Sequence, residues 1–459
     1  MLRKVLMRFS ERDYNEEFRA LVESDLEANR IGATTIRENL ERSPLWYDGR
    51  LTIETLQVPK ILTETTVADL KRIVRVAHAI FVKIIRAYLR DESLRRRFAF
   101  DPELEELILV STLENATSLL PMARFDVFYH EDSRDFYFCE VNTDGTSGMN
   151  DDRILRELFI SNPAFQEFRR LHTLEHFELF DSWIATFMRL CSRRIPQKPR
   201  PGVAIVDFLD RATLREFEEF ARRFQIAGVD CEICDVRELR YENGTLLDRR
   251  GRSIDAVYRR AVTHDLMERR DEVRPFLGAV RDGAVFPVGG LCTQIVHSKR
   301  FFYALHTEEA RRALTSEEIA FVEEHFPLTT PFHPDFCDLD EVLRNKDRYI
   351  LKPTDLYASK GVFAGVENDE SGWEQKARAV YGADYICQRF CPLYQTPNVD
   401  FVGGDGEWSG YTNMLGLFVY DGEFAGVLSR QAQGNAVIAS FRNERTIPTY
   451  FIRENDDET

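Results

Sequence analysis

ARFDVFY, at residues 123–129, and FYFCEVN, at residues 136–142, are the two stretches from which the fold is inferred. Both alternate polar and apolar residues one by one, as half-buried strands do. The six residues between them, HEDSRD, are polar and few enough to form a turn. The two stretches therefore predict a β-hairpin, with its loop at residues 132–134.

One side of this predicted hairpin carries two carboxylates. The loop position places Asp126 opposite Glu140 and Arg124 opposite Asn142. Opposed carboxylates repel each other unless a cation or a shared proton lies between them. With the amide oxygen of Asn142 they form an oxygen set that suits Mg²⁺, and the alternative is a solvated polar face with Arg124 paired to Glu140. The other side is expected to face a core and carries Phe125, Val127, Tyr129, Tyr137, Cys139 and Val141.

A loop rich in glycine and hydroxyl groups, TDGTSGMNDD at residues 143–152, follows the hairpin. It leads into a predicted helix over residues 153–159. A loop that runs into a helix offers free backbone N–H groups to an anion. We therefore expect an anion site beside the predicted metal ligands.

The composition is that of an acidic globular protein. The 459 residues suffice for roughly two to four domains, and 44% hydrophobic content with 34 phenylalanines supplies a large core. A formal net charge of -16 argues against nucleic acid as the main partner. The eight cysteines are scattered, and the single Cys-x-x-Cys pair favours reduced thiols in a cytoplasmic protein over zinc. No signal peptide or membrane span is expected, so no membrane partner is predicted.

Three kinds of pattern follow one another along the chain. Residues 1–120 are predicted to be mostly helical, with amphipathic helices at 12–29 and 67–89. After a linker near 193–201, strands alternate with a helix, which predicts a small parallel α/β unit. The expected elements of this unit are strands 203–206, 231–236 and 254–258, helix 213–225, and a tight turn at Asn243-Gly244.

The last third of the chain is expected to contain further strands and a capped helix. Ser298 is a plausible N-cap, and a two-residue turn at Asp421-Gly422 would set Arg430 opposite Asn413. The tail beyond residue 453 is acidic. The expected strands are 349–353, 362–366, 385–390, 411–420 and 423–430.

Lys352 ends a strongly apolar strand, where a lysine that is merely solvated is unusual. The loop after it contains Ser359-Lys360-Gly361. A lysine at the end of a strand and a loop of this kind fit a lid over phosphates. The alternative for Lys360 is an ordinary exposed loop lysine.

In order along the chain, these motifs resemble a circularly permuted ATP-grasp ligase of the glutathionylspermidine synthase kind. Residues 351–353, 359–362 and 385–390 look like the nucleotide-binding half of such an enzyme. Arg124-x-Asp126 and Glu140-x-Asn142 match the metal-site motifs of the family, and they precede the nucleotide lysines, as in the permuted branch. Residues 425–430 and 443–448 resemble the late segments of the family.

The chain departs from this family pattern in two places. Related proteins often have a Gly-Gly-Lys-Gly loop, whereas this chain has Ala358-Ser359-Lys360-Gly361, which should be stiffer. The amidase domain of bifunctional relatives has no room here, so the chain is expected to correspond to the synthetase part.

The resemblance implies an α/β (α+β) fold of the ATP-grasp kind, circularly permuted. It also implies a helical N-terminal region and a small parallel α/β domain of the pre-ATP-grasp type. The expected divisions are residues 1–200 for the helical region with the metal-binding hairpin lobe, 201–297 for the parallel domain, 298–453 for the nucleotide-binding lobe, and 454–459 for the acidic tail.

The activity implied by the resemblance is ATP-dependent ligation of a carboxylate to an amine through an acyl phosphate, with ATP and Mg²⁺. The substrates would be small molecules: an amino acid, a peptide or a polyamine. The alternatives are an inactive ATP-binding regulatory or scaffold protein and a kinase-like phosphotransferase.

Each candidate site residue has an expected role. For two of them a structural alternative stays open: Lys299 begins a surface helix, or Arg430 pairs with a nearby acid. The assignments are Arg124 and Arg430 for catalysis; Lys299, Lys352, Lys360, Gly361 and Gln388 for ATP; Asp126, Glu140 and Asn142 for the metal; and Asp144, Thr146 and Ser147 for the carboxylate substrate.

Overall fold

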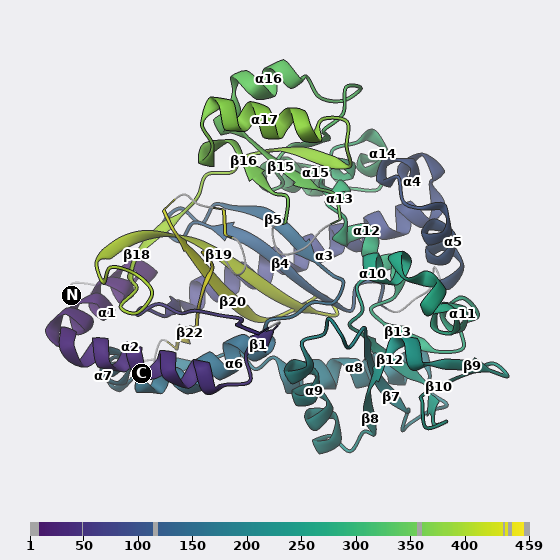
Figure 1. Ribbon diagram of the computed structural model, residues 1–459, viewed down its shortest axis with the longest axis horizontal. Coiled ribbons are helices and arrows are strands. Elements are labelled where there is room, and N and C mark those ends of the chain that lie inside the picture. The colour runs from purple at the N-terminus through teal and green to yellow at the C-terminus, as the bar shows by residue number, and fades with distance from the viewer. Residues whose placement is uncertain are drawn as a thin grey trace, which may run out of the picture.

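The computed structural model describes residues 9–47, 49–112, 118–355, 360–434, 437–438 and 443–453. Three main sheets, each with its own helices, make up most of this mixed α/β fold (Figure 1). Among the described helices, none combines the length and the apolar character that a membrane span requires.

The central sheet contains the predicted hairpin. Its strands run antiparallel in the order β21-β20-β19-β4-β5, with β18 paired to β19. Helix α3 packs against it, and there the rings of Phe81 and Phe125 meet edge to face with centroids 5.0 Å apart. The elements are α3 Glu64–Arg90, β4 Met122–Tyr129, β5 Phe136–Asn142, β18 Gln395–Val399, β19 Trp408–Tyr420, β20 Glu423–Gln433 and β21 Arg445–Ile447.

A smaller antiparallel sheet in the order β14-β17-β15-β16 lies above the central sheet in Figure 1. Helices α16 and α17 cover it, and Trp373 is buried between them and the sheet. Lys352 lies on β15, next to the last residue of the strand. The elements are β14 Thr329–Pro331, β15 Tyr349–Pro353, β16 Phe363–Ala364, β17 Tyr385–Arg389, α16 Leu339–Arg344 and α17 Glu370–Val380.

The predicted parallel unit is confirmed. Its strands pair in parallel in the order β13-β12-β7-β8, so the chain reverses its direction of winding between β7 and β12. The turn at Asn243-Gly244, with φ of 51° and 74°, joins β9 to β10 as expected. The elements are β7 Val203–Asp207, α9 Leu214–Ile226, β8 Cys231–Asp235, β9 Arg240–Glu242, β10 Thr245–Leu247, β11 Ser253–Ile254, β12 Ala256–Arg259 and β13 Phe286–Val288.

Helices from the N-terminal region complete the molecule. α1 and α2 pack against α6 and α7 at one end of the central sheet (Figure 1). The remaining bounds are α1 Glu11–Ser24, α2 Leu26–Arg42, β1 Trp46–Tyr47, β2 Arg50–Leu51, β3 Lys60–Leu62, α4 Glu92–Phe98, α5 Pro102–Ser111, α6 Met149–Leu158, α7 Pro163–Leu171, β6 Leu174–Glu175, α8 Phe180–Arg194, α10 Thr263–Glu268, α11 Arg274–Arg281, α12 Gln294–His297, α13 Arg300–Leu305, α14 Glu308–Arg311, α15 Ser316–His325 and β22 Thr449–Ile452.

The hairpin register at the predicted metal residues is confirmed, since Asp126 pairs with Glu140 and Arg124 pairs with Asn142. The loop is one residue longer than predicted, because His130 and Asp135 close it through a backbone hydrogen bond. A bulge then shifts the register back between Asp126 and Val127. As a result Phe136 and Phe138 face the core, and the expectation that Tyr137 and Cys139 do so was wrong.

A second bulge moves Arg430. The turn at Asp421-Gly422 forms as predicted, with positive φ at both residues. The register shifts between Phe418 and Val419, so Arg430 lies opposite Met414 and not opposite Asn413. The prediction missed this shift because a bulge leaves little trace in the alternation of a buried strand.

Several element bounds also differ from the predictions. Residues 12–29 lie in two helices that Asp25 separates, α6 begins before residue 153, and the strand expected at 362–366 is reduced to β16. Ser298 is the C-cap residue of α12 and not an N-cap, since Lys299 occupies the N-cap position of α13. The central sheet joins strands from the predicted 1–200 and 298–453 divisions. The tail at 454–459 and the loop residue Ser359 lie outside the described residues.

Candidate functional site

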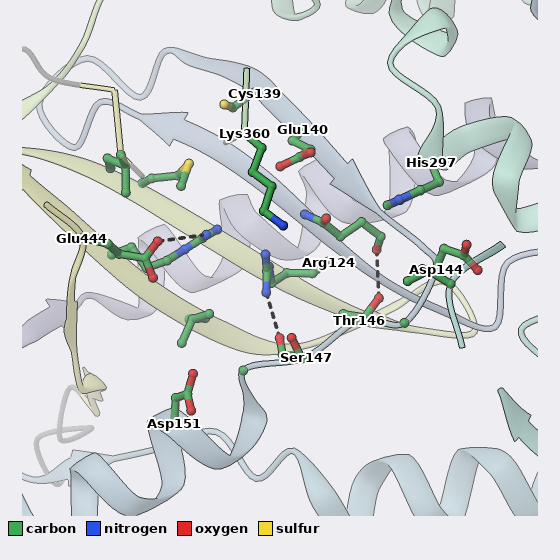
Figure 2. A pocket seen from close by; sticks show the side chains of 18 of the residues that line it. Arg124, Cys139, Glu140, Asp144, Thr146, Ser147, Asp151, His297, Lys360 and Glu444 are labelled. Atoms are coloured by element: carbon green, nitrogen blue, oxygen red, sulfur yellow. Dashed lines mark hydrogen bonds and ion pairs between the residues drawn. The ribbon is translucent and has the colours of Figure 1, made fainter. Parts of the chain in front are cut away.

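A cavity of about 610 Å³ lies between the central sheet, the small sheet and the parallel domain. Its volume is typical of small-molecule sites. All the predicted site residues line it except Asp126, which lies beneath its wall, and Gly361. Figure 2 shows the side chains that gather there from the hairpin, the loop after it and the later strands.

Asp126 is the centre of a buried charge cluster, and only 1% of the residue is exposed. Arg124 donates to both carboxylate oxygens, from Nε at 2.8 Å and from Nη2 at 3.2 Å. Nη2 of Arg430 lies 2.7 Å from Oδ2, and the Asn142 amide donates to the same oxygen at 2.9 Å. Asp126 therefore pairs with two arginines from two different strands and offsets one of their two charges.

Burial works against the charge of Arg430, but the carboxylates of Asp126 and Glu444 hold the pKa of its guanidinium above the ordinary value. Its Nε is buried and has no hydrogen-bond acceptor among the described residues. A buried donor of this kind costs free energy until an acceptor arrives. Arg430 is thus built to receive a further anion from the cavity.

Arg124 and Asp126 on β4 reach Arg430 on β20 across β19, the strand between them. They can do so because β19 has a glycine, Gly416, at the crossing point. It pairs with Asp126 in the sheet. A Cβ atom at this position would lie 2.7 Å from Cδ of Arg124 and 3.0 Å from Oδ1 of Asp126. The missing side chain therefore leaves the gap through which the cluster reaches Arg430.

Glu140 forms an ion pair with Lys299, a residue that the sequence analysis assigned to ATP binding. Its Oε1 lies 2.9 Å from Nζ of Lys299, which is itself largely buried. Burial alone would raise the pKa of Glu140, but the positive charge of Lys299, supported by His297 and Lys352, outweighs it and lowers the pKa to about 2. Glu140 is therefore ionised at neutral pH.

Lys352 is fixed from two sides. Its Nζ donates to Oε1 of Gln388 at 2.8 Å and to the carbonyl oxygen of Cys139 at 3.2 Å. The amide nitrogen of Gln388 donates to Thr329, so its side chain orients the lysine. Lys360 is exposed and extends into the cavity (Figure 2). Its neighbour Gly361 has a φ of 71°.

The start of α6 is already occupied by a carboxylate of the protein. Oε2 of Glu216 accepts from the backbone N–H groups of Gly148 and Asn150, each at 3.1 Å. Its Oε1 accepts from Arg260 at 2.9 Å, and only 4% of Glu216 is exposed. The expectation of free N–H groups for an external anion was wrong, because a glutamate from α9 caps this helix.

The three predicted substrate residues differ in their surroundings. Asp144 pairs with Arg259 and accepts from the backbone N–H of Thr263, so both its oxygens are engaged by the parallel domain. Thr146 donates to the carbonyl of Asn142 at 3.1 Å, and the Ser147 carbonyl accepts from Arg124 at 2.8 Å. The structure thus brings Ser147 to Arg124 and Thr146 to Asn142, and the roles of all three predicted substrate residues stay predictions.

Sequence reasoning missed Asp151, which lies in the first turn of α6 and lines the cavity (Figure 2). Burial raises the pKa of this carboxyl to about 7, and the negative charges of Glu216 and Glu444 act in the same direction. Carboxyls with such shifts are frequent in functional sites. Residues 143–152 were predicted to form a loop, so Asp151 was not recognised as part of the first turn of a helix.

Of the three predicted magnesium ligands, Glu140 and Asn142 reach the cavity and Asp126 does not, and Glu140 is paired there with Lys299. Glu140 is ionised, Asn142 turns its amide nitrogen to Asp126, and both residues line the cavity. Asp126 would have to exchange its arginines before it could bind a metal. Among the described residues, one group of three metal-binding side chains lies close together elsewhere: His264, Asp265 and Glu268, on α10.

No protein-family model matches the sequence, and neither does any curated protein. A glutathione synthetase-like effector from Globodera pallida has a similar structure, with a TM-score of 0.58 and 12% identity over 97% of this chain and 100% of that one. A putative gamma-glutamylcysteine synthetase from Methylobacillus flagellatus (10% identity, 86% of this chain and 90% of that one) and a D-cycloserine synthetase (19%, 56% and 75%) have TM-scores of 0.44 and 0.31, too low to support an argument. The chain thus shares the mixed α/β fold of the effector.

Proposed function

We propose that the protein is an ATP-dependent ligase that joins a carboxylate to an amine through an acyl phosphate. The observation that carries this proposal is the gathering of five cationic side chains in one cavity beside an ionised glutamate. Charge-assisted contacts from two sides are what a polyphosphate requires. The cations are Arg124, Lys299, Lys352, Lys360 and Arg430.

The lysines and the arginines would act on different parts of the nucleotide. Gln388 and a backbone carbonyl already fix Lys352, so its ammonium meets a phosphate oxygen without further ordering. Arg124 and Arg430 would hold the transferring phosphoryl group, and the unpaired Nε of Arg430 supplies a donor for it. Mg²⁺, when bound at Glu140 and Asn142 with Asp126 as the predicted third ligand, would neutralise phosphate charge.

The proposed reaction has two steps. A substrate carboxylate oxygen forms a bond to the γ-phosphorus while the bond to the ADP oxygen breaks. The amine nitrogen then attacks the acyl carbon, inorganic phosphate leaves and the amine loses a proton. The Ser147 carbonyl accepts from Arg124, and Thr146 is the residue before it, so the carboxylate would approach here.

The experiment is a screen of ADP formation over pairs of carboxylates and amines with Mg²⁺, followed by the mass of the product. ADP that forms only when the amine is present, with an amide product, supports the ligase. A phosphorylated product without need of an amine indicates a kinase-like enzyme, and no turnover indicates a binding protein. Glu140→Ala should abolish turnover, whereas Glu374→Ala, an exposed glutamate on α17, should not. Full activity of Glu140→Ala would contradict the metal assignment.

A further inference from the structure

The N-terminal region contributes a wall of the cavity that the proposed nucleotide site does not use. Pro44, Leu45, Trp46 and Thr52 line the cavity, and they follow the end of α2. Helix α2 packs against α6, whose first turn carries Asp151. This segment thus lines the same cavity as Asp151.

Trp46 is the most exposed aromatic side chain among the residues that line this cavity, with 47% of the residue exposed. Its indole N–H donates to the carbonyl of Glu41 at 3.0 Å. The polar atom of the ring is therefore already satisfied, and the ring offers a ligand an apolar surface only. A large apolar surface of this kind gains stability when a ligand covers it.

The segment is held in place. The backbone N–H and the hydroxyl of Thr52 both donate to the carbonyl of Leu45, at 2.9 and 3.2 Å, and the short strands β1 and β2 pair beside them. A fixed aromatic ring binds a partner at a lower entropic cost than a mobile one. Trp46 is thus a preformed part of the wall.

The wall combines this apolar surface with an anionic one. Leu428 of the central sheet is a further apolar residue of the cavity, and it lies close to Gly148, the residue before α6. Asp151 supplies the carboxylate. Further acids line the cavity, namely Asp207, Glu216, Asp265 and Glu444, so a polyamine is the competing acceptor that the test must distinguish.

We propose that the amine substrate is an amino acid or short peptide with an apolar side chain, which packs on Trp46 while its ammonium group faces Asp151. This inference rests on the proposed function and names the substrate class of the same site. The cationic residues would then hold the nucleotide at one end, and the acceptor would approach the acyl phosphate from the other.

The test compares phenylalanine, leucine, glycine and spermidine as acceptors in the ADP assay, with wild type and three variants. Wild type should prefer phenylalanine and leucine. Trp46→Ala should raise the KM for these two about tenfold and leave the KM values for glycine and ATP unchanged, while Trp46→Phe should keep most of the preference. Phe336→Ala is the control, because Phe336 is 48% exposed and does not line the cavity.

Preference for spermidine, or an equal loss of Trp46→Ala activity with every acceptor, would overturn the inference. Calorimetric titration of phenylalanine into the protein with a non-hydrolysable ATP analogue tests the same site without turnover. Binding that weakens in Trp46→Ala supports the inference even if no ADP forms, in which case the proposed function alone fails. Absence of binding overturns the inference even if ADP formation establishes a ligase.

Discussion

Replacing Gly416 with alanine should separate the two halves of the charge cluster. The added methyl group would lie 2.7 Å from Cδ of Arg124 and 3.0 Å from Oδ1 of Asp126. Arg124 has little freedom to move aside, because its guanidinium donates to Asp126 and to the carbonyl of Ser147. Overpacking of a buried site costs about 1–3 kcal/mol, and alanine recovers about 0.4–1 kcal/mol by restricting the unfolded chain. We expect a net loss of about 1–2 kcal/mol.

Urea unfolding measures this loss, and the ADP assay should show a rate about 10- to 100-fold lower, since the displaced arginine would no longer face the phosphoryl group. Gly410→Ala is the matched control in the same strand. There the added Cβ would meet only the tip of the exposed Gln395 side chain, which can move away. If the two variants unfold at the same urea concentration and turn over at the same rate, the role assigned to Gly416 is refuted.

Two further variants test the surroundings of α6. The pKa of Asp151 is higher in the folded protein, about 7, than in the unfolded chain; its charge therefore destabilises the fold above pH 7, and the penalty fades as the pH falls toward 4. Asp151→Asn should raise the thermal midpoint at pH 8 but not at pH 4, and an equal gain at both would contradict this. Glu216→Gln leaves Arg260 buried without its counter-charge, and urea unfolding should show a loss of about 3 kcal/mol; a loss below about 0.5 kcal/mol, typical of surface changes, would argue against the pair.

The prediction that Asp126 pairs with Glu140 is correct only because two errors in the predicted hairpin cancel each other. The loop is longer by one residue than expected, and the bulge that follows shifts the register by one residue in the opposite direction. Asp126 and Glu140 therefore face each other as predicted, while the core positions nearer the loop do not. The alternation of polar and apolar residues identifies strands well, but it does not reveal where a bulge interrupts a buried strand.

The contacts that the sequence did not predict are those between distant elements. Glu216 belongs to α9 and Arg260 follows β12, and only the packing of the parallel domain brings them to α6. No local pattern marks either residue. Gly416 did carry a usable signal, since a glycine inside a long strand often marks a close approach of other groups.

The charges of the cavity divide it into two ends, and this division restricts how any ligand binds. The five cationic side chains Arg124, Lys299, Lys352, Lys360 and Arg430 lie beside three carboxylates, Asp126, Glu140 and Glu444, so this group carries an excess of two positive charges within a protein of net charge -16. Such local excess attracts polyphosphate against the overall charge. Asp126 holds both arginines meanwhile, and it releases them only to a group that binds them more strongly, which a dianionic phosphoryl group does and a single carboxylate does not. The carboxylate of Asp151, when ionised, would repel that same group, which would favour an orientation with the phosphates at the lysines and the amine at Asp151.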